Sequence, residues 1–399
     1  MSILSTSLSR IKESPTIAIT QKARLLKESG KEVIALASGE PDFDTPDNIK
    51  AAAIKAIKEG QTKYTPVDGT TELKKAIVNK FKKENNLSFE VDNITVGTGG
   101  KQVIYNCILA TINPGDEVII PAPYWVSYAD IALVSNAKPV IVECGIEQKF
   151  KMTAKQLEKA ITPKTKLLIL NSPSNPTGAV YSKKELESLA KILTKHPNIL
   201  IGTDDMYEHV KLKDIPFYNI LNVEPSLKDR CVVMNGVSKA YSMTGWRIGF
   251  AAGPSYIIKA MEILQSQSTS NPTSISQVAA EAALSGEQAC MQPMIKAFRE
   301  RHDYVVKSFN EIPGLSCIEA QGAFYAFPDA RKAIERLYDQ KILKEKTDLA
   351  LADYLLEKEG VAVVPGSAFG SDGYFRISFA TSMDNLVEAM KRIKRALTG

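Results

Sequence analysis

The chain has 399 residues, of which 44% are hydrophobic and 24% are charged, and its formal net charge is +5. This length exceeds what one hydrophobic core usually covers, so we expect a globular protein with one large and one smaller domain. The small positive charge is not gathered into a basic tract, and the sequence therefore gives no support to nucleic-acid binding.

Helical and strand-like periodicities alternate through the first part of the chain. A helix is expected at Thr45-Pro46-Asp47, with proline at its first position. A glycine-rich turn at residues 95–101 leads into a second helix, and a capping box from Ser182 to Glu185 begins another. Short apolar runs, which we interpret as strands, lie at residues 118–120, 139–142, 166–170, 199–202, 232–234 and 248–252. This alternation predicts an α/β domain whose mainly parallel central sheet lies between helices.

The pattern changes near residue 290. A long polar helix that includes residues 299–309 is followed by short apolar segments and then by an amphipathic C-terminal helix with Leu386, Met390 and Ile393 on one face. The apolar segments lie at residues 317–319, 323–327, 361–364 and 374–378. We expect residues 46–290 to form the large domain. Residues 1–45 and 291–399 are expected to form a smaller α+β domain.

The numbers and positions of the cysteines and histidines limit the kinds of active site that the sequence supports. The five cysteines are odd in number and widely spaced, as in a reduced cytoplasmic protein: Cys107, Cys144, Cys231, Cys290 and Cys317. The three histidines do not cluster, so the sequence favours neither a metal site nor a Ser-His-Asp triad. Because no apolar stretch fits a signal peptide or a membrane span, we expect a cytoplasmic location and no membrane contact.

Reactive side chains follow several predicted strands. Asn175 follows the run at 166–170, Asp204 follows the run at 199–202, and Lys239 follows the run at 232–234. In such sheets the functional groups gather at the carboxyl ends of the strands. Taken singly, these residues are compatible with a turn, an ion pair and a solvated lysine.

Together with Arg247 and the glycine-rich turn, these residues offer an amine, a carboxylate, an amide, a guanidinium and free backbone N–H groups. A lysine near a buried strand end can have a lowered pKa and form a Schiff base with a carbonyl cofactor. A glycine-rich turn that opens a helix suits a phosphate. Pyridoxal 5′-phosphate uses all of these groups, and it is the cofactor that the sequence favours.

Six ordered motifs extend this hypothesis to nearly the whole chain. They are Ser38-Gly39-Glu40-Pro41-Asp42-Phe43, Tyr64-Thr65-Pro66, Pro123-Tyr124-Trp125-Val126-Ser127-Tyr128, Asn175-Pro176-Thr177-Gly178, the segment 237–247 around Lys239, and Tyr374-Phe375-Arg376-Ile377-Ser378. With these motifs the chain resembles the class-I pyridoxal-phosphate-dependent aminotransferases of fold type I. Within them it is most similar to the bacterial aspartate aminotransferase subgroup Ib, which includes aspartate/prephenate aminotransferases.

The resemblance implies a role for each matched residue that touches the cofactor. Lys239 would hold the cofactor and act as the catalytic base, Asp204 would face its ring nitrogen, and Trp125 would stack on its ring. Tyr64 would reach the phosphate of the neighbouring subunit, which implies a homodimer with shared active sites. The full cofactor-binding set implied is Gly99, Gly100, Lys101, Trp125, Asn175, Asp204, Tyr207, Lys239, Arg247 and Tyr64.

The resemblance also implies how a substrate would be held. Arg376 would bind the α-carboxylate with help from Asn175 and Gly39, and Trp125 would complete the substrate site. Lys101 would meet a distal carboxylate. Ser270 and Asn271 of the partner subunit would help, and Lys12 lies in a region that some relatives use for prephenate.

These roles imply a ping-pong reaction that moves the amino group of L-aspartate to 2-oxoglutarate, giving oxaloacetate and L-glutamate. Prephenate, converted to arogenate, is a second possible acceptor. The alternatives that keep the cofactor are a lyase and an aminotransferase for aromatic or other amino acids, since one fold hosts many chemistries. A ligand-sensing regulator is the non-enzymatic alternative, but the residues before Ser38 are too few for a DNA-binding module.

Overall fold

The computed structural model describes residues 3–11, 13 and 15–398. Lys12 therefore lies outside the described residues. None of the described helices is long and apolar enough to cross a membrane.

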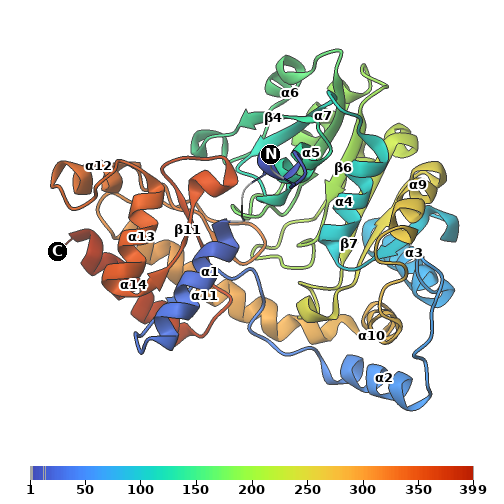
Figure 1. Ribbon diagram of the computed structural model, residues 1–399, viewed down its shortest axis with the longest axis horizontal. Helices are drawn as coiled ribbons and strands as arrows, with labels where there is room; N and C mark the ends of the chain where they lie inside the picture. The colour runs from blue at the N-terminus through green and yellow to red at the C-terminus, as the bar shows by residue number, and fades with distance from the viewer. Residues whose placement is uncertain (1–2, 12, 14, 399) are drawn as a thin grey trace.

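A seven-stranded sheet forms the centre of the larger part of the molecule (Figure 1), with strand order β2-β8-β7-β6-β5-β3-β4. The strands are β2 Ile94–Gly97, β3 Glu117–Ala122, β4 Lys138–Glu143, β5 Thr165–Asn171, β6 Leu200–Asp204, β7 Cys231–Gly236 and β8 Gly249–Ala252. Four neighbouring pairs are parallel, while β8 runs antiparallel to both β2 and β7. The predicted mainly parallel α/β sheet is confirmed, but β2 was missed, because residues 95–97 had been predicted as part of a glycine-rich turn.

Both faces of this sheet are buried by helices. Along β5, Leu168 and Leu170 pack into a core cluster on one face, while Leu167 and Ile169 pack into a second cluster on the other. Successive side chains of a strand point to opposite faces, so a strand that is apolar at every position needs a cover on each side. The helices of this part are α2 Asp47–Lys58, α3 Thr71–Asn85, α4 Gly100–Thr111, α5 Ser127–Val134, α6 Ala154–Ala160, α7 Lys183–Leu193, α8 Ile220–Val223, α9 Ser255–Ser266 and α10 Ser274–Ser285.

Two of the predicted helix starts can be compared directly with the structure. The capping box at the start of α7 is present, with the Ser182 side chain accepting from the Glu185 N–H and the Glu185 side chain accepting from the Ser182 N–H. The start of α2 was predicted one residue too early. Pro46 has an extended ψ of 144° and precedes the first helical residue, Asp47.

A second region joins the C-terminal third of the chain to its N-terminal segment (Figure 1, red and orange with the blue α1). The connection is made by backbone pairing, since Ile34 and Ala35 of β1 run parallel to Val361 and Ala362 of β10. Its helices are α1 Pro15–Glu28, α11 Gln292–Asn310, α12 Arg331–Asp339, α13 Asp348–Glu359 and α14 Met383–Thr398, and its other strands are β9 Tyr325–Ala326, β11 Val364–Pro365 and β12 Phe375–Ser378. The domain boundaries at residues 45 and 290 stay a prediction.

The strands of this second region are shorter than its apolar segments. Cys317 is buried, yet residues 317–319 form no strand, and Ser316 makes only an isolated bridge with Asp329. An apolar run indicates that a segment is buried. Because a coil segment can also be buried, such a run does not by itself predict a strand. Short 3₁₀ helices complete the described chain at Leu8–Arg10, Val91–Asn93, Ile146–Gln148, Pro225–Arg230, Thr244–Trp246, Gln288–Met291 and Gly366–Phe369.

Candidate active site

A cavity of about 280 Å³ lies at the carboxyl ends of β5, β6 and β7, where the two regions meet. Most of the predicted site residues line it: Gly39, Gly100, Lys101, Trp125, Asn175, Asp204, Tyr207, Lys239, Arg247 and Arg376. Gly99, Tyr64, Ser270 and Asn271 lie outside this lining, and the Tyr64 side chain is exposed. The chain thus brings together most of the residues predicted from one subunit, while those predicted to act across subunits lie elsewhere.

Lys239 follows β7 and extends its amine into the cavity. Its Nζ donates a hydrogen bond of 2.5 Å to the backbone oxygen of Gly39, which belongs to the N-terminal segment. Burial lowers the pKa of Lys239 to about 8, and the carboxylate of Glu40 only partly opposes this effect. The amine is therefore partly neutral near neutral pH and is available as a nucleophile or base.

Asp204 is the last residue of β6 and is buried beneath the same cavity. The hydroxyl of Tyr128 donates to its Oδ2 at 2.5 Å, and the Met206 N–H donates to its Oδ1 at 3.2 Å. Burial raises the pKa of Asp204, and these two hydrogen bonds oppose the rise. A carboxylate in this setting would be stabilised by a cationic ligand atom.

Arg376 lies on β12 at the opposite wall of the cavity. Its Nη1 donates to Asn175 Oδ1 at 2.9 Å and its Nη2 donates to the backbone oxygen of Ala37 at 2.6 Å, whereas its buried Nε has no partner among the described residues. The guanidinium carbon lies 4.4 Å from the centroid of the Tyr325 ring and 5.0 Å from that of Phe369. A guanidinium that lines the cavity and has no carboxylate partner among the described residues suits a ligand carboxylate.

The glycine-rich turn is adapted to a close anionic ligand. Gly99 has a φ of +84°, and a Cβ atom placed on it would lie 2.1 Å from Nη2 of Arg247. Gly100 begins α4, so its N–H belongs to the positive end of that helix. Arg247 contacts the turn through a hydrogen bond of 3.4 Å from its Nη2 to the backbone oxygen of Thr98, and its Nη1 donates to the backbone oxygen of Thr244 at 2.8 Å. Glycine is therefore required where the guanidinium approaches the backbone.

Lys101 and Trp125 form the outer part of the cavity wall. The Lys101 ammonium lies 5.1 Å from the centroid of the Trp125 ring. Burial lowers the pKa of Lys101, and the nearby Arg247 adds to this effect. The cavity thus collects cationic side chains from several elements, which favours a ligand that carries more than one negative charge.

Several residues in or beside the cavity had no role predicted from the sequence, and three of them contribute to its geometry. Tyr128 holds Asp204 as described above, and Thr16 of α1 lines the cavity wall. Tyr325 also lines the cavity, and its hydroxyl lies 2.8 Å from that of Tyr207. Tyr325 belongs to the apolar segment 323–327, where a tyrosine is indistinguishable from an ordinary core residue, so the sequence carried no signal for it.

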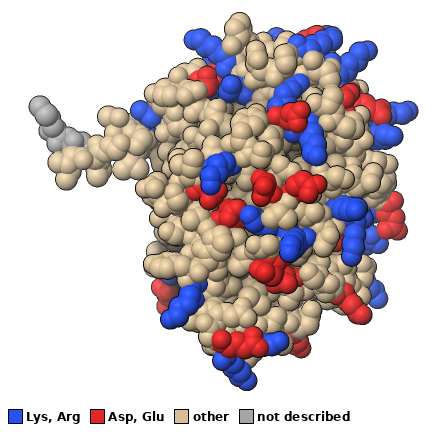
Figure 2. Space-filling view, turned by 90° about the vertical axis from the view of Figure 1, so that its right-hand side faces the viewer, with Lys and Arg blue, Asp and Glu red and all other residues tan. Residues whose placement is uncertain are grey.

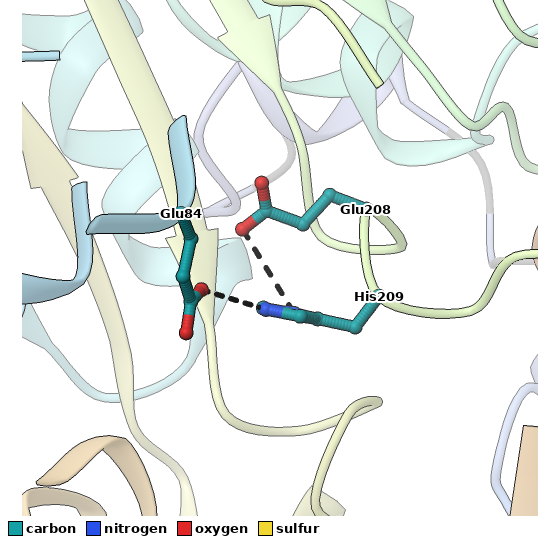
Figure 3. Close-up of side chains that lie close together, drawn as sticks. All are labelled: Glu84, Glu208 and His209. Carbon is teal, nitrogen blue, oxygen red and sulfur yellow. Dashed lines mark hydrogen bonds and ion pairs between the residues drawn. The ribbon is translucent and has the colours of Figure 1, made fainter. Parts of the chain in front are cut away.

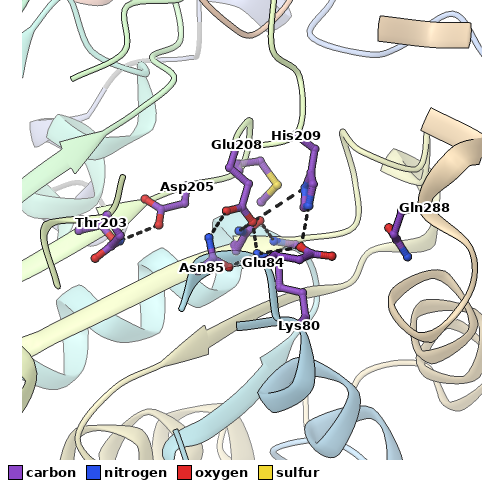
Figure 4. Close-up of polar contacts among 12 residues, drawn as sticks. Lys80, Glu84, Asn85, Thr203, Asp205, Glu208, His209 and Gln288 are labelled. Atoms are coloured by element: carbon purple, nitrogen blue, oxygen red, sulfur yellow. Dashed lines mark hydrogen bonds and ion pairs between the residues drawn. The ribbon is translucent and has the colours of Figure 1, made fainter. Parts of the chain in front are cut away.

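A buried ionic cluster supports the loop that follows β6 (Figure 4). Glu208 forms an ion pair with Lys80 of α3, and Asn85 and Asn235 also donate to its carboxylate. His209 contacts Glu84 at 2.8 Å. Burial disfavours ionisation of Glu208, but Lys80 and its other partners outweigh burial and lower its pKa to about 2.

Glu84, Glu208 and His209 could together be read as ligands for a metal ion (Figure 3). The Lys80 ammonium, however, already lies against Glu208 and within 3.5 Å of Glu84. A bound lysine cation supplies the positive charge that a metal would bring. We therefore interpret this cluster as a structural support of the loop.

Comparison with known proteins agrees with this geometry. The family pattern of the class I and II aminotransferases matches residues 31–393. The aspartate/prephenate aminotransferase of Nitrosomonas europaea is 60% identical over 395 residues, which cover 99% of this chain and 100% of that protein.

Solved structures give the same result. The aspartate aminotransferase of Rhizobium meliloti aligns with a TM-score of 0.94 at 47% identity, covering 100% of this chain and 99% of the other. The aspartate aminotransferase of Thermus thermophilus with maleate aligns with a TM-score of 0.93 at 39% identity, covering 100% of both chains. The chain belongs to the class I and II aminotransferase family.

Proposed function

We propose that this aminotransferase uses pyridoxal 5′-phosphate to move the amino group of L-aspartate to 2-oxoglutarate, giving oxaloacetate and L-glutamate, and that it also converts prephenate to arogenate. The observation that carries the proposal is the arrangement of three buried groups around one cavity. These are the amine of Lys239, the carboxylate of Asp204 and the guanidinium of Arg376.

The side chains fit this cofactor group by group. Asp204 would hold the ring nitrogen in its protonated form, because that cation offsets the cost of burying the carboxylate. Gly99, Gly100 and Arg247 would hold the phosphate at the start of α4. The remaining contacts would come from Trp125 on the ring face, from Asn175 and Tyr207 at the phenolic oxygen, and from the backbone of Lys101 at the phosphate. When bound, the cofactor supplies an electron sink for the substrate α-carbon.

Lys239 would act as the base of the reaction. Its amine, whose pKa is about 8, would take the α-proton of the bound substrate onto Nζ. The hydrogen bond from Nζ to Gly39 shows that the amine reaches the N-terminal segment that closes the cavity. Gly39 and Asn175 would help Arg376 to orient the α-carboxylate.

The proposal of a dicarboxylic substrate is based on Lys101 in the outer part of the cavity wall. Lys101 lines the cavity and would bind the distal carboxylate. The relative from Nitrosomonas europaea is called an aspartate/prephenate aminotransferase, and the structure from Thermus thermophilus holds maleate, a dicarboxylate. Ser270 and Asn271 of the partner subunit would assist Lys101, and we keep a role for Lys12 in prephenate binding as part of the proposal.

We also propose a homodimer that operates in the cytosol. Tyr64 is 94% exposed in the single chain, which suits a residue that completes the phosphate site of a second subunit. All five cysteines are free, and four of them are buried, as suits a reducing compartment.

The visible spectrum of the purified protein tests this function. We expect a band from the bound cofactor that disappears when aspartate is added and returns with 2-oxoglutarate, since the two half-reactions are independent. A panel of amino donors then compares aspartate with aromatic amino acids and with glutamate plus prephenate. A protein that binds the cofactor but releases ammonia from its substrates would be a lyase, and the proposal would be wrong.

A further inference from the structure

We propose that Tyr325 is a positioning residue that serves both halves of the active site, its hydroxyl orienting Tyr207 and its ring supporting Arg376. This inference rests on the proposed function, because it concerns how these two residues present their donors to the cofactor and to the substrate carboxylate.

Tyr325 stands between the two residues in space. It lies on β9, where it is fully buried and pairs with Ser378 of β12, the strand that carries Arg376. Its hydroxyl lies 2.8 Å from the hydroxyl of Tyr207, which follows β6 of the large sheet. The guanidinium carbon of Arg376 lies 4.4 Å from the centroid of its ring. One side chain therefore contacts the binding groups of both ligands.

Which of the two hydroxyls donates the hydrogen bond follows from the number of protons that they carry. Each hydroxyl has one proton, and burial raises the pKa of both tyrosines, so neither ionises near neutral pH. If Tyr207 donates its proton to the phenolic oxygen of the cofactor, it has none left for Tyr325. Tyr325 must then be the donor and Tyr207 the acceptor. A hydroxyl that accepts a hydrogen bond is polarised and donates more strongly.

The ring of Tyr325 performs the second task. A guanidinium stacked on an aromatic face keeps its planar fork in one orientation. Arg376 has two of its nitrogens bound to Asn175 and Ala37, and the ring supports the plane that they define. We infer that the stacking holds the guanidinium of Arg376 in position before a carboxylate arrives.

The two tasks can be separated with two variants. Tyr325→Phe removes the hydroxyl and keeps the ring, whereas Tyr325→Leu removes both. Tyr338→Phe, on the exposed side of α12, is the control for loss of a tyrosine hydroxyl. Arg376 and Asp204, whose charges act on the pair, are retained in every variant.

For Tyr325→Phe the main measurement is a pH titration of the visible band of the bound cofactor. A donor at the phenolic oxygen stabilises the deprotonated chromophore, so weakening that donor raises the midpoint. We expect a rise of roughly a few tenths of a unit, because Tyr325→Phe weakens this hydrogen bond without removing it, and a whole neutral hydrogen bond corresponds to about one unit or less. Tyr207→Phe should raise the midpoint further, and the double variant should match Tyr207→Phe alone, because Tyr325 acts through Tyr207.

For Tyr325→Leu the main measurement is KM. We expect KM for both aspartate and 2-oxoglutarate to rise about three- to tenfold above that of Tyr325→Phe, since only the ring stacks on Arg376. Thermal unfolding with and without cofactor checks that this variant folds. If it does not fold, Tyr325→Phe still tests the role of the Tyr325 hydroxyl.

An unchanged midpoint in Tyr325→Phe, or shifts that add in the double variant, would overturn the hydroxyl relay. Equal KM values in the two variants would overturn the role of the ring. If the unmodified protein shows no cofactor band at all, the proposed function fails, and that result is distinct from a failure of this inference.

Discussion

Lys80 of α3 and Glu208, which follows β6, form an ion pair in which the side chains are only 1% and 4% exposed. Glu208 directly follows Tyr207 in the loop after β6, and both Tyr207 and Asp204, the last residue of β6, line the cavity. Because removing charges from water costs several kcal/mol per ion, such a pair adds little net stability. The ion pair leaves the Glu208 carboxylate few alternative positions. We therefore interpret it as fixing the conformation of the loop after β6.

Removing one member of this pair should destabilise the protein. We expect Glu208→Gln or Lys80→Met to lower the free energy of unfolding by about 3–5 kcal/mol, because each removes the main partner of a buried charge. The double variant should recover much of this loss. Chemical denaturation of the four proteins measures the coupling, and additive losses would contradict the interpretation.

The same pair predicts how acid affects stability. The pKa of Glu208 is about 2 when folded and lies below its ordinary value of 4.5, so the folded state favours the ionised form. The stabilisation is therefore complete above pH 4.5 and is lost as the pH falls from 4.5 through about 2. The unfolding midpoint of Glu208→Gln should depend less on pH in this range than that of the unmodified protein.

Attachment of the cofactor should depend on the ionisation of Lys239. Only the neutral amine is nucleophilic, and its pKa is about 8, so the rate of attachment to cofactor-free protein should rise with pH and level off above about 8. Borohydride reduction followed by mass spectrometry measures the bound fraction. Lys239→Ala should fold, bind no cofactor covalently and have no appreciable activity, while exposed Lys191→Ala should behave normally. Near-normal transamination by Lys239→Ala would falsify the proposed function.

The two carboxylate sites should give different kinetic patterns. Arg376→Lys should raise KM by about tenfold or more for every amino acid and 2-oxo acid, since all of them carry the α-carboxylate. Lys101→Ala should raise KM for aspartate and 2-oxoglutarate. It should leave KM for alanine, which lacks a distal carboxylate, largely unchanged. Arg331→Lys, at a half-exposed pair with Asp329, is the matched control. If Lys101→Ala leaves aspartate kinetics unchanged, its assigned role is wrong.

The shared active site predicts complementation between inactive subunits. We expect a solution mass of about twice 43.7 kDa, and weaker cofactor binding in Tyr64→Ala although Tyr64 lies outside its own cavity. Co-expression of Lys239→Ala with Tyr64→Ala should give mixed dimers in which one site has both residues intact. Those dimers should bind cofactor as tightly as the unmodified protein at half the sites. If the mixed dimers had no site that binds the cofactor tightly, the proposal that the two subunits share their active sites would be contradicted.

The sequence by itself determined six of the seven strands of the large sheet and the residues that follow them, whereas β2 had been predicted as part of a turn. A strand that is buried on both faces leaves a continuous apolar run, and the polar residue after it marks the edge where ligands bind. Asp204 and Lys239 were identifiable for this reason, and the ordered motifs linked them to Arg376. Local patterns were less informative beyond residue 290, where coil segments are as buried as strands.

The tertiary structure alone decided which side chains meet. Tyr207 and Tyr325 are 118 residues apart, and Lys80 and Glu208 are 128 apart, so no periodicity or spacing connects them. Likewise, the free donor of Arg376 becomes visible only when its other nitrogens are seen to be bound. Hydrogen bonds and ion pairs depend on distances of a few ångströms between distant segments, and packing of the whole chain sets those distances.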